Sequence, residues 1–396
     1  MKYIKQIGMS LLCLSLSTVS ACESKKTNKT IIAQANAEDH KHKSNTVQIA
    51  LLLDTSNSMD GLIEQAKAQL WDIVNKFAYV RAKCGNDPTP DYIRPDLQIA
   101  LYQYGNDGLS SKEGYIQQVL GFSDDLDEIS EKLFSLTTNG GEEYCGEVIQ
   151  TSLKQLEWGK NPDHLKMIFI AGNEPFSQGK LNYKDATTNA KEKGVVVNTI
   201  FCGNYEQGIS GHWKDGAQQS GGDYFAIDHN KKLVQIDTPY DDVIIRLNKR
   251  LNTTYISYGY LGASKVQNQY KQDSNAMELE ESVAIKRAVS KSSRLYSNAS
   301  WDLVDAAEDK EFDISKIKKE QLPVELKSKS NKEIEIYITQ KKKERIQIQK
   351  EIQELNTKRQ AYIAKNQKDG NTGELENAMI SAIKKQAEKK SYKWDE

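Results

Sequence analysis

Between residues 46 and 253, short apolar runs alternate with longer stretches in which apolar residues recur every three or four positions. The short runs predict strands and the longer stretches predict amphipathic helices. Such an alternation is typical of parallel strands joined by crossover helices, and it predicts an α/β fold with a doubly wound, mainly parallel six-stranded sheet. We expect strands at 47–53, 97–104, 116–120, 165–171, 195–202 and 223–227, and helices at 60–83, 124–136, 146–158, 182–193, 208–220 and 241–251.

Residues 254–396 are rich in Lys and Glu and show almost no strand pattern, which predicts an α-helical C-terminal region. Ser330 and Glu333 have the spacing of a capping box that opens a long helix ending near Asn366. The apolar stripe of this helix predicts either a coiled-coil surface for a partner or one arm of a helical hairpin within the chain, and we favour the hairpin. The stripe contains Ile348, Ile352, Leu355 and Tyr362, is interrupted by Arg345 and Arg359, and would pack on Leu375, Ala378, Met379, Ala382 and Ile383.

The N-terminal residues 1–21 have the pattern of an export signal, a basic head followed by an apolar run. The run Val-Ser-Ala-Cys at 19–22 resembles a bacterial lipoprotein signal, which implies that the mature chain begins at a lipidated Cys22. The alternative is an ordinary secretory signal cleaved after Ala21. Residues 22–45 are polar without an apolar period, as in a flexible tether. We therefore expect a lipid-anchored protein of the bacterial cell envelope, facing the periplasm or on the cell surface.

Composition narrows the classes of function. The chain has 396 residues, 38% of them apolar and 28% charged, which is enough for real hydrophobic cores. The formal net charge is −1, so the chain lacks the positive field that nucleic acid binding requires. The N-terminal apolar stretch is shorter than the roughly 18–20 residues of a membrane-spanning helix. We expect no nucleic acid partner, and contact with the membrane through the lipid anchor only.

The residues with candidate chemistry follow the first predicted strand, in the run Asp-Thr-Ser-Asn-Ser-Met at 54–59. Asp54, Ser56 and Ser58 place three oxygen atoms in the turn between a strand and a helix, an arrangement that favours a hard divalent cation. The alternative is that these side chains only cap the following helix and tighten the turn. We favour the cation site.

In this motif, and in the order and spacing of its predicted strands, the segment 46–251 resembles the von Willebrand factor A family. The resemblance implies a metal-ion-dependent adhesion site, in which a cation keeps an open position for a carboxylate of a protein partner. It also implies that the domain spans 46–253 and that a helical region, 254–396, follows it.

Two further loops supply ligands in that family. The second loop matches a Gly-Gly-Glu-Glu run, so that Glu142 or Glu143 would be the ligand. The third loop has Gly172 where the family usually has Asp, with Asn173 or Glu174 available for a supporting contact. Because one charged ligand is missing, we expect weak binding of Mg²⁺ or Mn²⁺, or of Ca²⁺.

Besides the lipidated Cys22, the mature chain keeps Cys84, Cys145 and Cys202, in a compartment where disulfides persist. Cys202 ends the fifth predicted strand, and Cys145 opens a helix that returns antiparallel to the strands. Both should therefore lie at the ligand edge of the sheet, whereas Cys84 should lie at the opposite edge. We predict a disulfide between Cys145 and Cys202.

Motifs for catalysis are absent from the sequence. It contains no Gly-x-x-x-x-Gly-Lys phosphate loop, no His-Glu-x-x-His zinc pair and no Gly-x-Ser-x-Gly elbow. Cys145 as a nucleophile with His164 or His212 as its base is an alternative that we disfavour against the disulfide. We expect no enzymatic activity.

Two stretches of the tail, N-T-T-Y-I-S-Y-G at 252–259 and W-D-L-V-D at 301–305, resemble the C-terminal part of a group of bacterial A-domain lipoproteins. Their aromatic residues predict either a partner surface or anchors that hold the helical region on the sheet domain, and we favour the anchors. The whole pattern predicts a membrane-anchored, exported module that binds a protein ligand through a degenerate adhesion site. The alternative is a structural envelope component that assembles through its tail and carries a vestigial metal site; a hydrolase comes third.

Overall fold

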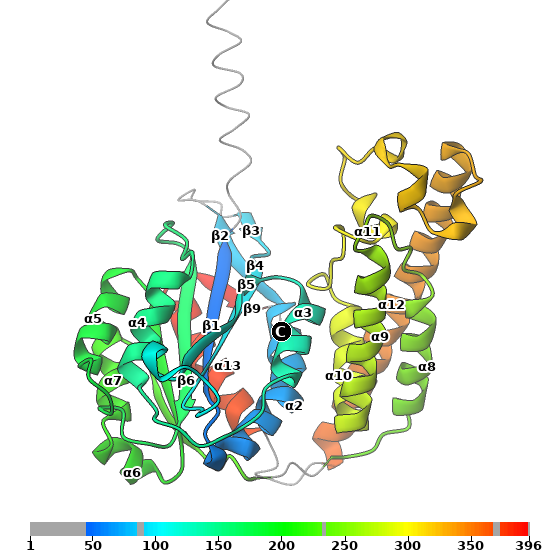
Figure 1. Ribbon diagram of the computed structural model, residues 1–396. Coiled ribbons are helices and arrows are strands. Elements are labelled where there is room, and N and C mark those ends of the chain that lie inside the picture. The colour runs from blue at the N-terminus through cyan, green and yellow to red at the C-terminus, as the bar shows by residue number, and fades with distance from the viewer. Residues whose placement is uncertain (1–44, 85–90, 232–234, 367–372, 395–396) are drawn as a thin grey trace, which may run out of the picture. The chain divides into compact units, whose positions relative to one another are not determined.

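The computed structural model describes residues 45–84, 91–231, 235–366 and 373–394, which all belong to one compact unit, Ser44–Glu396 (Figure 1). The predicted signal 1–21, Cys22 and the predicted tether up to residue 44 lie outside the described residues. No helix in the described ranges combines the length and the apolar character needed to cross a membrane.

The centre of the molecule is a six-stranded sheet with the order β5-β4-β1-β6-β7-β8. β1 pairs in parallel with β4 on one side and with β6 on the other, and β5 at the edge runs antiparallel to β4. Each predicted strand of this sheet is present, so the doubly wound, mainly parallel α/β class is confirmed. The strands are β1 Thr46–Asp54, β4 Asp96–Tyr104, β5 Ile116–Ser123, β6 Leu165–Gly172, β7 Val196–Cys202 and β8 Tyr224–Ile227.

Helices cover both faces of the sheet, each over its own hydrophobic core (Figure 1). Leu51 and Leu53 of β1 lie in one core and Leu52 in the other, because successive side chains of a strand point to opposite faces. α2, α3 and α13 cover the first core, and α4, α5 and α7 cover the second. The bounds are α2 Asp60–Phe77, α3 Leu126–Phe134, α4 Cys145–Gln155, α5 Tyr183–Glu192, α6 Tyr205–Ser210, α7 Trp213–Ser220 and α13 Glu374–Glu388, with short 3₁₀ turns η1 Asn57–Met59 and η2 Ser111–Glu113.

Two predicted helices differ from the structure. The helix predicted at 60–83 ends at Phe77, because the chain continues into a strand of a small antiparallel sheet with the order β3-β2-β9. The helix predicted at 208–220 is divided into α6 and α7, because His212 adopts a left-handed conformation with φ 70°. The strands of the small sheet are β2 Val80–Cys84, β3 Asp91–Ile93 and β9 Tyr392–Trp394.

Residues 241–366 form a helical bundle beside the sheet domain (Figure 1). α8, α10 and α12 share a third hydrophobic core, and α9 packs on α10. The predicted capping box begins α12: Ser330 N donates to Glu333 Oε2 at 2.8 Å, and Glu333 N donates to Ser330 Oγ at 3.4 Å. The elements are α8 Asp241–Asn252, α9 Gly262–Leu279, α10 Glu281–Lys291, α11 Leu303–Ala306, η3 Ile314–Lys316, η4 Lys319–Gln321, η5 Val324–Leu326 and α12 Asn331–Asn366.

The position of α13 corrects the predicted helical hairpin. α13 does not pair with α12: it lies against α2 and the sheet, whose core it completes. Most of the α12 stripe is covered by α8 and α10 instead, where Ile348 and Ile352 are fully buried, but Tyr362 is exposed. An apolar stripe shows that a helix face is buried, but it does not show which surface covers it. The residues of α13 in the sheet core are Leu375, Ala378, Met379, Ala382, Ile383 and Ala387.

The two aromatic stretches of the tail meet in one buried network. Ile256 N donates to Asp302 Oδ1 at 2.6 Å, and Arg345 of α12 donates to Asp302 Oδ2 at 2.7 Å. The Arg345 guanidinium also lies 4.0 Å from the centroid of the Tyr255 ring. Arg345, which interrupts the apolar stripe in the sequence, is therefore a buried link between α12 and both stretches. Arg359 is likewise buried, with its Nε 3.0 Å from Asp241 Oδ1.

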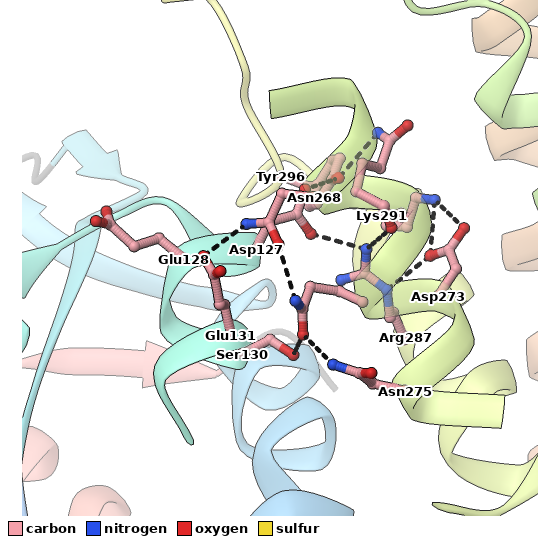
Figure 2. Close-up of polar contacts among 12 residues, drawn as sticks. Asp127, Glu128, Ser130, Glu131, Asn268, Asp273, Asn275, Arg287, Lys291 and Tyr296 are labelled. Carbon is pink, nitrogen blue, oxygen red and sulfur yellow. Dashed lines mark hydrogen bonds and ion pairs between the residues drawn. The ribbon is translucent and has the colours of Figure 1, made fainter. Parts of the chain in front are cut away.

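A second buried network joins α3 of the sheet domain to α9 and α10 (Figure 2). Arg287 lies between two carboxylates, 2.7 Å from Asp127 Oδ1 and 2.7 Å from Asp273 Oδ1. Lys291 Nζ lies 3.0 Å from Asp273 Oδ2, and the Tyr296 hydroxyl donates to Asp127 Oδ2 at 2.6 Å. Both cations are fully buried, and each faces a carboxylate, as charges removed from water require. The tyrosine connects this network to the aromatic stretches, since its ring packs on Tyr255.

The predicted disulfide is wrong: Cys145 and Cys202 are both free, buried thiols. Cys202 lies in the core under α2 and α13, whereas Cys145 lies in the core under α4 and α5. Topology places both at the same edge of the sheet, but the pleat of β7 turns Cys202 to the other face. Burial raises the pKa of both thiols well above the ordinary value, so neither is an activated nucleophile. The side chain of Cys84 lies outside the described part of the chain.

Candidate functional site

The candidate site is the turn that follows β1 at the carboxyl edge of the sheet. Asp54 is the last residue of β1 and is fully buried, Ser56 is buried and Ser58 is exposed. The Asp54 Oδ1 atom accepts a hydrogen bond from Ser56 N at 2.7 Å, and the hydroxyls of Ser56 and Ser58 are 3.3 Å apart. The turn therefore gathers the three oxygen-bearing side chains that the motif predicts.

The second loop brings one of its two glutamates to this turn. Glu143 is buried and Glu142 is exposed. Burial, reinforced by the neighbouring Asp54 carboxyl group, raises the pKa of Glu143 to about 9. Burial also raises the pKa of Asp54. Two carboxyl groups thus share a space with little water, where a proton or a cation between them relieves their repulsion.

Gly105 lies against both of these carboxyl-bearing side chains. Gly105, directly after β4, has φ +75°, a conformation that favours glycine. A Cβ atom at this position would lie 2.7 Å from Glu143 Cγ and 2.9 Å from Asp54 Oδ1. The close approach of Glu143 to the turn therefore depends on a residue without a side chain at the end of β4.

Tyr104 accounts for the missing Asp of the third loop. Its buried hydroxyl donates to Ala171 O at 3.0 Å. A Cβ atom on Gly172 would lie 2.6 Å from the Tyr104 hydroxyl oxygen and 3.1 Å from Asp54 Oδ2. The tyrosine hydroxyl thus occupies the space that a side chain at position 172 would need.

The two remaining predicted residues of the third loop lie near the turn: Asn173 contacts Ser58, and Glu174 acts on Asp54 through its charge. Asn173 Nδ2 donates to Ser58 Oγ at 3.1 Å. Glu174 is exposed, and its charge contributes to the raised pKa of Asp54. His229, after β8, is a further neighbour, with its Nε2 atom 3.1 Å from the Ser58 carbonyl oxygen.

Several residues that support this site were not predicted from the sequence. Gln178 Oε1 accepts from Glu143 N at 2.9 Å and so holds the second loop. Asn106 Nδ2 donates to Thr137 O at 3.0 Å and holds the start of the same loop. These residues follow β6 and β4, so their position at strand ends was the one signal that could have suggested them.

One observation tests whether these residues fit a metal ion. Asp54 Oδ2 is buried and has no hydrogen-bond partner, whereas Oδ1 serves the turn. The described ranges hold no group of three or more His, Cys, Asp and Glu side chains that could bind a metal. The ligands would therefore be the Asp54 and Glu143 carboxylates with the Ser56 and Ser58 hydroxyls, all oxygen donors of the kind that hard cations prefer. These four residues fit a hard cation, with only two charged ligands among them.

Comparison with known proteins finds a family model that matches most of the sheet domain. The family model described as von Willebrand factor type A domain matches residues 48–214. A comparison with curated proteins finds none that matches the chain.

Three solved structures illustrate the likeness. The chain is 16% identical to the conserved hypothetical protein BatB from Bacteroides thetaiotaomicron, covering 46% of this chain and 90% of that one, with a TM-score of 0.33. It is 16% identical to the SpRpn10 VWA domain, covering 46% and 88%, with a TM-score of 0.33. It is 16% identical to proximal thread matrix protein 1 of the mussel byssus, also with a TM-score of 0.33; the match covers 46% of this chain and spans 42% of the length of that protein. The family match and the strand order together identify residues 48–214 as a von Willebrand factor type A domain.

Proposed function

We propose that this protein is an exported, lipid-anchored interaction module whose A-domain binds a protein partner at the carboxyl edge of its sheet. Von Willebrand factor A domains are commonly protein-interaction modules. In this proposal a divalent cation, held weakly by Asp54, Ser56, Ser58 and Glu143, receives a carboxylate of the partner. Cys22 carries the lipid that retains the module in the cell envelope.

The observation that carries the cation site is the unpartnered Asp54 Oδ2 beside Glu143. If Asp54 only shaped the turn, the hydrogen bond from Ser56 N to Oδ1 would suffice. Burial of the second oxygen and of a second carboxyl group would then be compensated only by a proton shared between Asp54 and Glu143. A bound cation accounts for both groups.

The tail gives little support to the alternative of a structural component that assembles through its helices. Ile348 and Ile352 of the α12 stripe are buried against α8 and α10, and Leu355 packs beside them, whereas Tyr362 is exposed. The stripe therefore offers no free coiled-coil seam. The proposal gives Cys145 no role as a nucleophile, because burial raises the pKa of its thiol well above the ordinary value.

Thermal unfolding with and without Mg²⁺ or Mn²⁺ tests the site. A cation that binds the folded state at about ten times its Kd should raise the free energy of unfolding by about 1.4 kcal/mol. Asp54→Asn should abolish this increase, because it removes a charged ligand and keeps the size of the side chain. The matched control is Asp107→Asn, which changes an exposed acidic residue just beyond Gly105. Its free energy of unfolding should rise with the cation as that of the wild type does.

Two outcomes would contradict the cation site. One is a wild-type protein whose unfolding is indifferent to millimolar Mg²⁺ and Mn²⁺. The other is an increase that survives in Asp54→Asn, which would place the bound ion elsewhere on the molecule. Capture of a partner from envelope extracts that resists chelator would contradict the cation's role in binding.

A further inference from the structure

An exposed apolar tip lies at one end of the helical bundle. Gly259 has φ +77°, and this turn leaves Tyr260 84% exposed and Leu261 66% exposed just before α9 begins. Val324, at the start of η5, is 82% exposed. The two segments are neighbours, since Gly259 N donates to Gln321 O at 3.0 Å. Single exposed apolar residues are ordinary at protein surfaces, whereas three large ones on two bonded loops indicate a contact surface.

Lysines are frequent in the segment that contains Val324. From the start of η3 to the first turn of α12, residues 314–333 contain six lysines and three glutamates: Lys316, Lys318, Lys319, Lys327, Lys329 and Lys332, with Glu320, Glu325 and Glu333. Lys318 and Lys319 are exposed and directly precede the segment that bonds to Gly259. Aromatic and aliphatic side chains flanked by lysines are typical of surfaces that lie in the headgroup region of a bilayer.

The tip lies at the same end of the molecule as the start of β1. Lys265, one turn into α9, pairs with Asp125 at the N-terminus of α3, which follows the end of antiparallel β5. Arg294, after α10, donates to Pro95 O at the start of β4, and Asp96 N donates to Asn45 O. This end of the bundle is therefore joined to the amino edge of the parallel strands, where the described chain begins (Figure 1).

We infer that Tyr260, Leu261 and Val324 insert into the headgroup region of an anionic membrane, with Lys318 and Lys319 at its surface. The inference takes the lipid anchor at Cys22 from the proposed function. The anchor lies on the chain that leads into β1, and the tip shares that edge. The Asp54 site lies at the opposite, carboxyl edge of the sheet. Membrane contact at the tip thus turns the binding site away from the bilayer and toward a partner.

Vesicle binding by the unlipidated mature chain tests the tip without the anchor. We would use residues 22–396 with Cys22→Ser, and vesicles of phosphatidylcholine with phosphatidylglycerol. The pair Tyr260→Ser and Leu261→Ser should weaken binding about tenfold or more, since affinity follows the apolar area inserted. The matched control is Tyr270→Ser with Met277→Ser, large exposed residues of α9 farther from the tip, which should bind as the parent does. Lys318→Gln with Lys319→Gln should weaken binding about tenfold to anionic vesicles and little to neutral ones.

A spectroscopic readout locates the contact. The emission of Tyr260→Trp should shift to the blue when vesicles are added, and brominated lipids should quench it. No binding by the parent at millimolar lipid, or an equal loss in both Ser pairs, would overturn the inference, as would a bound Tyr260→Trp without the shift. Binding that persists equally on vesicles without anionic lipid would remove the role of the lysines. Failure here leaves the cation test untouched, because that test measures unfolding at the other edge of the sheet.

Discussion

Tyr104 and Gly172 decide how many charged ligands the strand-end turn can hold. The Tyr104 hydroxyl is buried and bonded to Ala171 O, and any side chain at position 172 would collide with it. The site is thereby restricted to the carboxylates of Asp54 and Glu143. Affinity for hard cations grows with the number of charged oxygen ligands, so we expect weak binding.

The junction between α3 and the bundle depends on a single residue, Arg287, which pairs with carboxylates on both sides. Arg287→Met should lower the free energy of unfolding by about 3 kcal/mol or more, because it leaves the buried Asp127 carboxylate without a cation, whereas Asp273 keeps Lys291. Arg246→Met, at an exposed position of α8, should change it by no more than about 0.5 kcal/mol. Urea unfolding of both variants measures the difference. An Arg287 variant as stable as the control would show that the ion pairs of Figure 2 do not hold the junction.

At the scale of elements, α13 is the helix whose position matters most. It returns from the end of the bundle to fill the face of the sheet beside α2, and β9 then pairs with β2. Its first turn also contacts the bundle helix α10 through charge: Lys286 of α10 pairs with Asp72 of α2 at 2.6 Å, and both act on Glu376. The amide of Glu376 donates to Gln69 Oε1 of α2 at 2.5 Å. α2, α10 and α13 therefore form one connected layer.

Stability should depend on pH through Glu376. Burial, with the nearby Asp72 carboxylate, raises its pKa from 4.5 to about 7. The folded state thus holds this proton more tightly than the unfolded chain does. The contribution of protonated Glu376 to the free energy of unfolding is fully present below about pH 4.5 and is lost as the pH rises through 7. Glu376→Gln cannot lose that proton, so its stability relative to wild type should increase between pH 5 and 8.

The control for this experiment is Glu388→Gln, at an exposed position near the end of the same helix. The difference between Glu388→Gln and wild type should stay flat over that pH range. Thermal unfolding at several pH values measures both differences. If the stability difference between Glu376→Gln and wild type also stayed constant with pH, the raised pKa of this carboxyl group would be contradicted.

At the scale of the whole molecule, the described residues form one unit in which a helical tail is bound to the A-domain at several places. Buried ion pairs join α3 to α9 and α10, and α13 belongs to the core of the sheet. Residues 254–396 therefore form part of the folded sheet domain and extend it with a helical bundle. We expect the A-domain to unfold together with the bundle and not as a separate domain.

The proposed anchor is tested in cells. Cys22→Ser should move most of the protein out of the membrane fraction and leave only the weak binding of the tip, because a lipid on this residue is the strongest hydrophobic attachment that the sequence provides. Cys13→Ser, within the predicted signal, is the control and should remain membrane-bound. Fractionation with mass spectrometry of the mature N-terminus measures both. Unchanged processing and membrane association of Cys22→Ser would exclude the lipoprotein signal.

Local sequence patterns determined the sheet strands, most helices and the capping box of α12, because periodicity and caps act within a few residues. The motif at 54–59 likewise indicated where three oxygen donors would meet. Only the tertiary structure decided that α13 covers the sheet, that Glu143 and not Glu142 approaches Asp54, and that Cys145 and Cys202 lie on opposite faces. These outcomes depend on which distant surfaces meet and on the phase of a strand's pleat, and neither is recorded in a residue's own neighbourhood along the chain.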